Sequence, residues 1–441
     1  MGKVTLNVDQ TKAVHQITKW WLGNKMYLVL DSKAGTGKTF LVNHVLPKLT
    51  TSAPLLLCPT NESLAQLRDK TEGDYTFKTI ASALGITPTT HKKDITFEHR
   101  GIPSLWEDYN LCIVDEASMV SDLELDLLLS IGIKILFLGH SSQLSPIVTS
   151  RKLRDLCISP VFTKGWETIK LTIPMRNTGT LWEFNNIVES MIYDRRIQLP
   201  NTFDTKKKDM MGYLESTEGK EALLAGDTKV VLWTNNGVDT YNDKLRLILF
   251  GATARRNKYL PGDRIILTKP MVIIPDLEKY SSPNLIALSK DKDSLDSLYS
   301  NAKALVVSST VLEVVLLPDL SFACYKIEAL CEGRLVYLYD IVSKVDRQRI
   351  ADYYEQLAWS RTTAEARRKG YKYRHFILSC FADVKHYFAG TSHRLQGSSV
   401  PTIVVALSDI VKNQCVVERA KCRYVACSRA MNELMVYRGV G

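Results

Sequence analysis

The sequence lacks the features of several classes of protein. Its nine cysteines include no Cys-x-x-Cys pair and no cluster with histidine at zinc-binding spacing, which argues against a disulfide scaffold or a local zinc site. It has no apolar run of about 18 residues, since Glu124, Asp126 and Lys134 interrupt the apolar stretch 123–138. The N-terminus has no apolar signal core, and Leu6 stands where a myristoylation motif needs Ser or Thr. We therefore expect a soluble, cytoplasmic protein with reduced thiols and no membrane partner.

Composition indicates the size of the fold and leaves its partner open. The chain has 441 residues, 45% hydrophobic and 24% charged, which is ordinary usage for a globular protein of about two to four domains. Lys and Arg number 57 against 47 Asp and Glu, so the formal net charge is +10. A basic excess is compatible with a polyanionic partner but does not identify one.

Short apolar, β-rich runs alternate with helical patterns through the first 150 residues. The strand-like runs are 26–30, 54–58, 111–114 and 133–138. This alternation predicts an α/β sheet with helices on both faces. Similar strand patterns predict a second α/β unit, and they lie at 230–233, 265–267, 403–407 and 434–437.

A region with a different pattern of predicted elements interrupts the second unit, from about residue 260 to residue 376. Four strand patterns with no helix between them predict a small inserted β-barrel: 305–307, 312–317, 324–329 and 335–338. A basic, tyrosine-containing stretch follows at 361–375. It could face nucleic acid, because basic and aromatic side chains alternate there, or it could form a solvated helical arm.

The strongest motif is Ser-Lys-Ala-Gly-Thr-Gly-Lys-Thr at 32–39, between a predicted strand and a predicted helix. Its glycines let main-chain N–H groups point at phosphate oxygens, its lysine can reach the β- and γ-phosphates, and its last hydroxyl can hold Mg²⁺. Ser32 stands where the pattern normally opens with Gly, which questions the geometry of the first turn but not the chemistry. The residues expected to bind nucleotide are Gly35, Thr36, Gly37, Lys38 and Thr39.

A pair of carboxylates supports this phosphate site. The predicted strand 111–114 ends in Asp115 and Glu116, and the carboxyl end of a parallel strand lies at the sheet edge where a phosphate loop also lies. Asp115 can hold Mg²⁺ through water, and Glu116 can act as general base on the attacking water. Alone, the pair would indicate a solvated helix start, but with the loop upstream it indicates hydrolysis of a nucleoside triphosphate.

At this point the chain resembles superfamily 1 helicases, and more closely the RecD/Dda-like 5′-to-3′ branch (1B), which includes enzymes of T-even bacteriophages. The similar segments follow the family's motif order over nearly the whole chain: 6–14, 57–67, 79–86, 115–118, 139–146, 171–177, 233–242, 389–399 and 424–430. Each late motif is weak by itself, whereas the ordered set is specific. Departures from the family pattern are Ala81, His140, Arg394 and Ser428.

The resemblance implies a role for each matching residue. Gln10 would read adenine, Gln143 would sense the γ-phosphate, and Arg176 and Arg429 would be arginine fingers. The implied catalytic residues are Lys38, Glu116, Gln143, Arg176 and Arg429, with Gln10, Asp115 and Gln396 also at the nucleotide and Thr39 and Asp115 at Mg²⁺. If both fingers come from the second α/β domain, they reach the phosphate only when two domains close, which is the action of a stepping motor.

The resemblance also implies a track for nucleic acid. Single-strand grips need hydroxyls and amides on phosphates and flat side chains under bases. The matching residues are Thr60, Asn61, Thr79, Thr234, Asn235, Thr391 and His393, although each alone is more often a turn residue or helix cap. In the family, a hairpin at 87–111 would be the pin that splits a duplex, with Phe97 as its aromatic; burial of Phe97 under the hairpin is the alternative. The family also favours 361–375 as an arm that braces this pin.

The expected fold class is α/β: two RecA-like P-loop NTPase domains, a pin hairpin inserted in the first and an SH3-like β-barrel in the second. The expected domains are 1–86 with 112–170, the pin 87–111, 171–260 with 377–441, and the barrel with its arm 261–376. The expected function is an ATP- and Mg²⁺-dependent DNA helicase that moves 5′ to 3′ on single-stranded DNA.

Further partners and alternatives follow from the same resemblance. The expected partners are single-stranded and forked duplex DNA, with a single-strand-binding protein or other replication proteins, and the expected state is a monomer. One alternative is a single-strand translocase that displaces proteins without efficient unwinding. Another is a non-catalytic nucleic-acid-binding module with a decayed nucleotide site, for which Ser32 and His140 are the sequence support. RNA in place of DNA also stays open.

Overall fold

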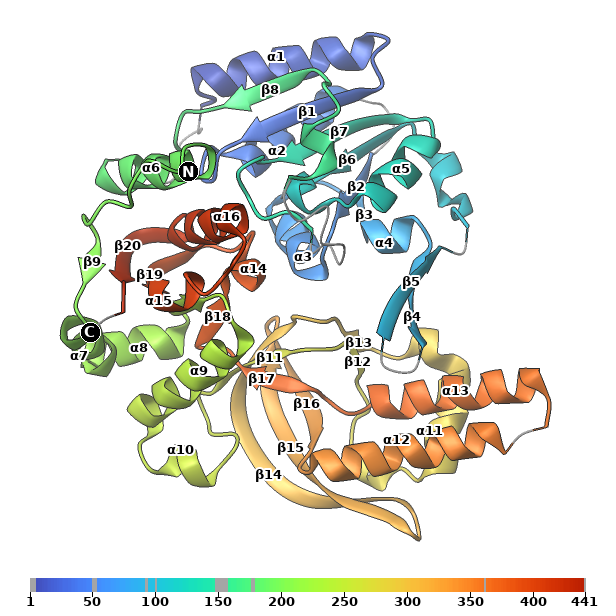
Figure 1. Ribbon diagram of the computed structural model, residues 1–441. Helices are drawn as coiled ribbons and strands as arrows, with labels where there is room; N and C mark the ends of the chain where they lie inside the picture. Colours follow the sequence, from blue (N-terminus) through green and yellow to red (C-terminus); the bar gives the residue numbers. More distant parts are fainter. Residues whose placement is uncertain are drawn as a thin grey trace. The chain divides into compact units, whose positions relative to one another are not determined.

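A computed structural model describes residues 5–49, 54–91, 94–99, 101–146, 158–175, 179–360 and 362–439 (Figure 1). Of residues 87–91, 94–98, 292, 293 and 364, only the backbone is described. The chain forms two compact units. Unit 1 comprises Met1–Gly212, Asp227–Val238 and Gly390–Gly441, and unit 2 comprises Tyr213–Gly226 and Asp239–Ala389.

The first half of unit 1 is a six-stranded sheet with the order β3-β2-β6-β7-β1-β8, in which every pairing is parallel. Its strands are β1 (Tyr27–Ser32), β2 (Leu55–Cys58), β3 (Thr76–Thr79), β6 (Leu111–Val114), β7 (Lys134–Gly139) and β8 (Thr168–Leu171). The four strands predicted from the first 150 residues are all present. They are continuously apolar because both faces of a parallel sheet are covered.

Alternate side chains of these strands enter two separate cores. Leu28 and Leu30 of β1 pack in one core, and Val29 between them packs in the other. The first core is shared with α1 (Val8–Leu22), α2 (Lys38–Leu49) and α3 (Asn61–Lys70). The second core is shared with α4 (Ile80–Ala83) and α5 (Asp122–Ser130). Helices therefore cover both faces, as the alternation of patterns predicts.

An antiparallel hairpin leaves this sheet after α4. It consists of β4 (Ile86–His91) and β5 (Asp94–His99), with Phe97 opposite Pro88 in the register. The two ends of the hairpin lie close together, since a Cβ on Gly85 would lie 2.3 Å from the carbonyl oxygen of Gly101. The predicted hairpin is therefore present, while the side chain of Phe97 lies outside the described residues.

Unit 1 contains a second sheet with the order β18-β10-β19-β20-β9. Its strands are β9 (Asp204–Thr205), β10 (Thr228–Leu232), β18 (Ala389–Thr391), β19 (Val400–Ala406) and β20 (Ala430–Tyr437). The helices of this part are α6 (Thr180–Tyr193), α14 (Ser392–Leu395), α15 (Leu407–Ile410) and α16 (Val416–Cys427), and α6 and α16 pack in its core. The second α/β sheet was predicted, but the pattern at 265–267 does not belong to it.

Unit 2 is built on a five-stranded antiparallel sheet with the order β16-β15-β14-β11-β17. Its strands are β11 (Arg264–Leu267), β14 (Lys303–Leu317), β15 (Leu320–Cys331), β16 (Arg334–Ile341) and β17 (Val384–His386). The pattern at 265–267 is β11, because three apolar residues cannot specify which sheet they join. The patterns 305–307 and 312–317 form one strand with a register shift after Val306. This sheet is consistent with the predicted β insertion.

The helices of unit 2 include the predicted arm. They are α8 (Thr217–Ala225), α9 (Asn235–Phe250), α10 (Thr253–Arg256), α11 (Ser282–Leu288), α12 (Lys344–Trp359) and α13 (Ala364–Ser379), with α7 (Lys207–Glu215) and α9 each crossing a boundary between the units. The basic stretch is largely α13, whose Phe376 and Ile377 share a core with Ile350 and Tyr354 of α12. Within the described residues, no helix has both the length and the apolarity needed to cross a bilayer.

Candidate active site

The phosphate loop is tightly curled between the end of β1 and the start of α2. Gly35 and Gly37 have φ angles of +82° and +81°, which favour glycine. At Gly37 the space is also closed, since a Cβ would lie 2.5 Å from Nε2 of Gln10. Thr36 is buried, and its hydroxyl donates to the carbonyl of Lys33 at 2.9 Å. The geometry therefore agrees with the motif.

The departure at Ser32 does not disturb this loop. Ser32 is the last residue of β1 and pairs with Leu171 of β8. Its hydroxyl donates to the carbonyl of Gly139 at the end of β7, at 3.4 Å. A position in a strand does not require glycine, so the serine is compatible with the conformation of the loop.

Gln10 joins the loop to the first helix. Its Oε1 accepts from the main-chain N–H of Asn7 at 3.1 Å, within the capping box at the start of α1. Its Nε2 donates to the carbonyl of Thr36 at 3.1 Å. An amide has a second N–H and a second lone pair, so these contacts are chemically compatible with the predicted contact to adenine.

The ammonium of Lys38 lies between the two predicted carboxylates. Its Nζ is 2.6 Å from Oδ1 of Asp115 and 3.3 Å from Oε1 of Glu116. Burial alone would lower the pKa of Lys38, but the negative charges of Asp115 and Glu116 outweigh burial and hold it above its usual range. The lysine is therefore charged near neutral pH.

Glu116 occupies an unusual position. Its backbone is left-handed, with φ +54°, which is uncommon for a residue with a side chain and typical of functional sites. Burial raises the pKa of its carboxyl, but the charges of Lys38 and Arg429 and the hydrogen bonds from Lys38 and Gln396 outweigh burial and lower it. Glu116 is therefore ionised, as a general base must be.

The residues at this edge fit a nucleotide phosphate with Mg²⁺. A pocket is lined by Lys38, Thr39, Ser63, Gln66, Leu67, Lys70, Asp115, Glu116 and Gly397. Within the described residues, Oε2 of Glu116 and Oε1 of Gln396 are buried oxygens without a hydrogen-bond partner. Carboxylate and hydroxyl oxygens are the ligands that Mg²⁺ prefers, and the lysine supplies the cation that a phosphate needs.

Gln143 lies at the same edge, in the segment that follows β7. It is buried, and its Oε1 accepts from the hydroxyl of Ser118 at 3.4 Å. Nε2 of Gln396 donates to the same hydroxyl at 3.1 Å. Ser118, to which sequence reasoning gave no role, thus connects the predicted γ-phosphate sensor with a residue of the second sheet.

Arg429 reaches this edge from the second sheet. It is buried, and its guanidinium donates to the carbonyls of Val425 and Ser398, both at 3.2 Å, and to the hydroxyl of Ser428 at 3.1 Å. Its charge acts on Glu116, as described above. The other predicted finger, Arg176, lies outside the described residues.

The predicted strand-binding threonines all cap helices. Thr60, Thr79 and Thr391 accept N–H hydrogen bonds at the starts of α3, α4 and α14, and Thr234 accepts one from Gly237. Thr234 also donates to Asp409 at 2.9 Å. Asn61 and Asn235 are the first residues of α3 and α9. The helix-cap reading is correct for the threonines, and a contact with a nucleic-acid strand stays a prediction.

His393 lies beside two residues that are distant in the sequence. Its Nε2 is 3.4 Å from Oε1 of Glu418, and ligand atoms of His393, Glu418 and Cys422 all lie within 4.8 Å of one another. Cys422 has no histidine near it in the sequence, but it has one near it in space. The sequence could not show this neighbour, because the contact depends on α14 packing against α16.

A second charged cluster, which the sequence reasoning missed, lies next to the phosphate loop. Glu189 of α6 is 3.1 Å from Nε2 of His140 and 2.9 Å from Nζ of Lys33, and it accepts from Ser142 at 2.8 Å. Burial raises the pKa of Glu189, but its contacts with His140, Lys33 and Ser142 outweigh burial and lower it to about 2. His140 thus replaces an acid of the family motif by pairing with an acid from α6. Only its departure from the motif could have indicated this.

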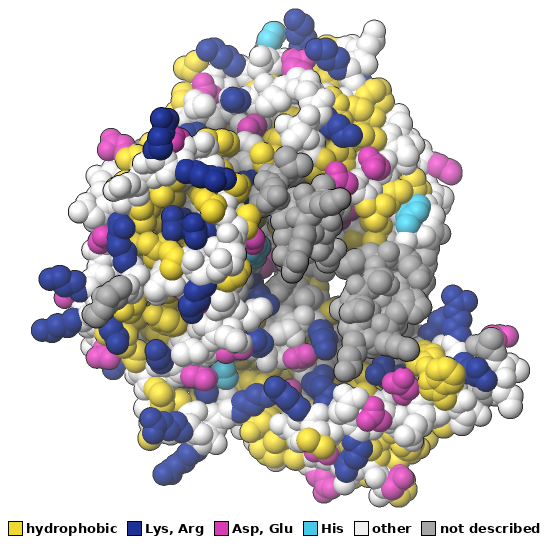
Figure 2. Space-filling view, in the orientation of Figure 1, with side chains coloured by type: hydrophobic (Ala, Val, Ile, Leu, Met, Phe, Trp, Pro, Cys, Tyr) yellow, Lys and Arg dark blue, Asp and Glu magenta, His cyan; other side chains and the backbone are white. Residues whose placement is uncertain are grey.

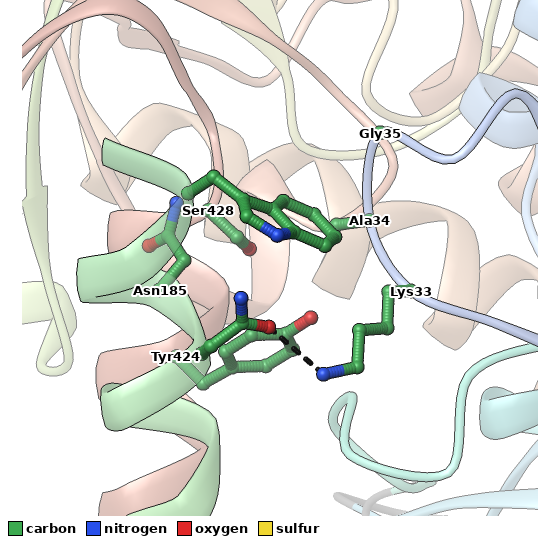
Figure 3. Close-up of a pocket in the computed structure, with 8 residues that line it drawn as sticks. Lys33, Ala34, Gly35, Asn185, Tyr424 and Ser428 are labelled. Atoms are coloured by element: carbon green, nitrogen blue, oxygen red, sulfur yellow. Dashed lines mark hydrogen bonds between the residues drawn. The ribbon is translucent and has the colours of Figure 1, made fainter. Parts of the chain in front are cut away.

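Residues of α6 and α16 face the phosphate loop across a small pocket (Figure 3). Lys33 and Gly35 lie on the loop side, and Asn185, Tyr424 and Ser428 lie opposite. The loop is therefore in contact with elements of both sheets of unit 1.

Comparison with known proteins agrees with these features. Residues 5–183 match the family described as AAA domain. The ATP-dependent DNA helicase Dda of enterobacteria phage T4 is 25% identical over 279 residues, which are 60% of this chain and 62% of that relative. The match thus spans less than two thirds of the relative's length.

Two solved structures share the fold over nearly the whole chain. One is a Pif1 helicase chain from a structure of two coordinating Pif1 helicases at forked double-stranded DNA. It is 16% identical to this chain, with a TM-score of 0.52, and the match covers 98% of this chain and 92% of the Pif1 chain. The Pif1 helicase from Bacteroides with ADP-AlF3 and single-stranded DNA is 15% identical, with a TM-score of 0.51 over the same shares.

The loop, the carboxylates and the two parallel sheets make this chain a P-loop NTPase of the α/β class. Its sequence is similar to that of the Dda helicase, and its fold is similar to that of the Pif1 helicases. The resemblance seen in the ordered motifs is confirmed.

The loop geometry gives a first prediction. Gly37→Ala places a methyl group against Gln10 at a positive φ, so we expect nucleotide affinity to fall by about tenfold or more. Gly165→Ala is the matched control, because its φ is +70° but a Cβ there meets nothing within 4 Å. Titration with a fluorescent ATP analogue measures both. Equal affinities for the two variants would contradict the loop assignment.

The charged cluster gives a prediction about pH. The pKa of Glu189 is depressed in the folded state, so its stabilising effect is complete above its unfolded value of about 4.3 and is lost as pH falls towards about 2. Glu189→Gln should therefore destabilise unit 1 by roughly 3 kcal/mol near neutral pH and by progressively less below about pH 4.5.

Urea unfolding followed by tryptophan fluorescence, from about pH 7 to about pH 3, measures this difference. Glu183→Gln, which changes an exposed carboxylate on the same helix, is the control and should show no such dependence. A loss of stability for Glu189→Gln that is constant over this range would refute the ion-pair explanation.

Proposed function

We propose that the protein is an ATP-dependent DNA helicase that moves 5′ to 3′ along single-stranded DNA and unwinds duplexes. One observation carries this proposal: Gln396 and Lys421, from elements of the second sheet, donate to Ser118 and to Gln143 beside the phosphate site of the first sheet, and Arg429 follows the same helix as Lys421. A cation supplied by a second sheet makes hydrolysis depend on the arrangement of two sheets. That dependence is what converts hydrolysis into movement.

The proposed chemistry follows from the geometry of the first sheet. Charge spreads over the equatorial oxygens during phosphoryl transfer, and Lys38 lies where it can stabilise that charge. Thr39 and Asp115 would hold Mg²⁺, which would neutralise charge on the β- and γ-phosphate oxygens. Glu116 would take the proton of the attacking water, with Gln143 as γ-phosphate sensor. Arginine fingers typically contribute about 10³–10⁵ in rate, and Arg429 and Arg176 would supply this contribution.

The proposed track for DNA uses polar caps and a hairpin. The hydroxyls of Thr60, Thr79, Thr234 and Thr391 cap helices. Thr234 donates its own hydrogen to Asp409, whereas the hydroxyls of Thr60, Thr79 and Thr391 can each donate to a phosphate or to a neighbouring acceptor. Asn61, Asn235 and His393 complete the proposed contacts. Figure 2 shows Lys and Arg side chains interspersed with acidic and apolar ones on the visible face, which is compatible with a track that does not depend on one basic patch.

The wider proposal covers domains and partners. We assign 1–86 with 112–170 and 171–260 with 377–441 to two motor domains, 87–111 to the pin, and 261–376 to the inserted β domain. The names of the relatives support DNA as the substrate, since they mention forked double-stranded and single-stranded DNA. A monomer that works in the cytoplasm with a single-strand-binding protein or other replication proteins is part of the same proposal.

The proposed polarity is tested by strand displacement. We expect ATP-dependent displacement from forked and 5′-tailed duplexes and little from 3′-tailed duplexes. Glu116→Gln should bind ATP as the wild type does but lose displacement, because a glutamine cannot accept the proton of the water. Displacement from 3′ tails alone would overturn the polarity, and full displacement by Glu116→Gln would remove Glu116 from the mechanism.

The hairpin is the observation that favours unwinding over translocation alone. Phe97→Ala should reduce displacement by about tenfold while ATP hydrolysis in the presence of DNA is retained, because a stacked ring contributes about 1–3 kcal/mol per base. Phe97→Trp, which keeps a flat ring, is the control and should retain displacement. If Phe97→Ala displaces strands normally, the alternative of a different pin residue or of a translocase without a pin gains support.

A further inference from the structure

The segment from His140 to Gln143, which we call the sensor segment, is held by side chains from both sheets of unit 1. Asp31 of the first sheet accepts from the N–H and hydroxyl of Ser141, at 3.1 and 3.0 Å. Glu189 of α6, a helix that packs in the core of the second sheet, contacts His140 and Ser142. The sensor segment is therefore a place where a change in one sheet is felt by the other.

A buried lysine makes the most direct of these contacts. Lys421 of α16 is 1% exposed, and its Nζ donates to the carbonyl of Ser141 at 2.9 Å and to the carbonyl of Gln143 at 2.8 Å. An ammonium group is expensive to bury, and charge-assisted hydrogen bonds to main-chain oxygens are strong enough to offset that cost. Because the acceptors are carbonyls, the lysine fixes the backbone that carries the side chain of Gln143.

The same helix leads directly to the predicted finger, Arg429. Lys421 and Tyr424 are three residues apart and therefore lie on one face of α16, and the hydroxyl of Tyr424 is 3.3 Å from Nδ1 of His140. Arg429 follows the C-terminal end of α16 directly after Ser428, which caps the helix. A shift of the sensor segment is thus transmitted to α16. Because the backbone of Arg429 follows the end of α16, a shift of this helix also moves Arg429, the residue whose charge acts on Glu116.

We propose that Lys421 is a positioning residue that couples the γ-phosphate sensor Gln143 to the arginine finger Arg429. This inference rests on the proposed function of the site. In this role Lys421 acts on the backbone of the sensor segment, and it sets the position of α16 according to the position of that segment. Hydrolysis therefore requires that the sensor and the finger be in place together.

The test is a double-mutant cycle on ATP hydrolysis with Lys421→Met and Arg429→Ala. Methionine keeps the length of the side chain but cannot donate a hydrogen bond. We expect Lys421→Met to lower kcat by about tenfold, within the range of about 5- to 150-fold for coupled sites, with the Kd for ATP unchanged within a factor of about three. The double variant should be no slower than Arg429→Ala alone, because the finger that Lys421 positions is already absent.

Two further variants separate positioning from stability. Lys421→Arg can donate to the same carbonyls and should recover part of kcat. Lys229→Met changes another buried lysine of the second sheet, at the start of β10 and so at the opposite edge from the carboxyl ends of its strands, and it should leave kcat unchanged. The proposal would be overturned if the reduction in kcat of the double variant were the product of the reductions in the two single variants. It would also be overturned if Lys229→Met lowered kcat as much as Lys421→Met does.

A readout without turnover keeps this test separate from that of the proposed function. We expect ATPγS to protect the amides of α16 from hydrogen exchange in the wild type but not in Lys421→Met. If the wild type hydrolyses ATP at a rate that does not respond to DNA, the proposed helicase function is refuted. The double-mutant cycle on ATP hydrolysis can still be measured in that case. Equal protection in both proteins would overturn the role of Lys421, whatever the activity.

Discussion

The contact between the ammonium group of Lys38 and the carboxylates of Asp115 and Glu116 is the interaction around which unit 1 is arranged. Two buried carboxylates and a partly buried ammonium are stable together only if the backbone holds them at hydrogen-bond distance. The positive φ angles of the loop and the left-handed backbone of Glu116 provide that geometry at the edge where β1 and β6 end. A nucleotide phosphate would enter a site whose charges are already in place, so little reorganisation is needed.

The second sheet adds to this centre what the first cannot supply. It contributes Arg429 and Gln396, which act on Glu116, and Lys421 and Tyr424, which hold the segment after β7. Every one of these side chains is buried, so none can move without its partners. The site on the first sheet is therefore linked by direct contacts to elements of the second sheet.

The sequence predicted what depends on local pattern. Strands β1, β2, β6 and β7 and the loop glycines follow from apolar periodicity and from residues with fixed conformational needs, whereas the hairpin was implied by the family resemblance. The motif order predicted that Lys38, Asp115, Glu116, Gln143, Gln396 and Arg429 would meet, and the structure brings them to one edge. The charge of Arg429 acts on Glu116 although the two residues are 313 positions apart in the sequence, from 116 to 429.

Contacts between segments without a motif could not be predicted in this way. The partner of His140 is Glu189, in a helix with no motif, and the neighbour of Cys422 is His393, on another helix. Which sheet β11 joins is decided by pairing with β14 and β17, not by its own three apolar residues. Such partners depend on how elements pack, and a hydrophobic pattern does not encode the identity of the neighbour.

The central claim is that hydrolysis at Lys38 and Glu116 is coupled to a strand held by the same protein. The most direct measurement is the rate of ATP hydrolysis with and without single-stranded DNA at saturating nucleotide. We expect kcat to rise by about tenfold or more when DNA is added, since a bound strand favours the arrangement in which Arg429 reaches the phosphate. A rate that is the same with and without DNA would contradict the motor.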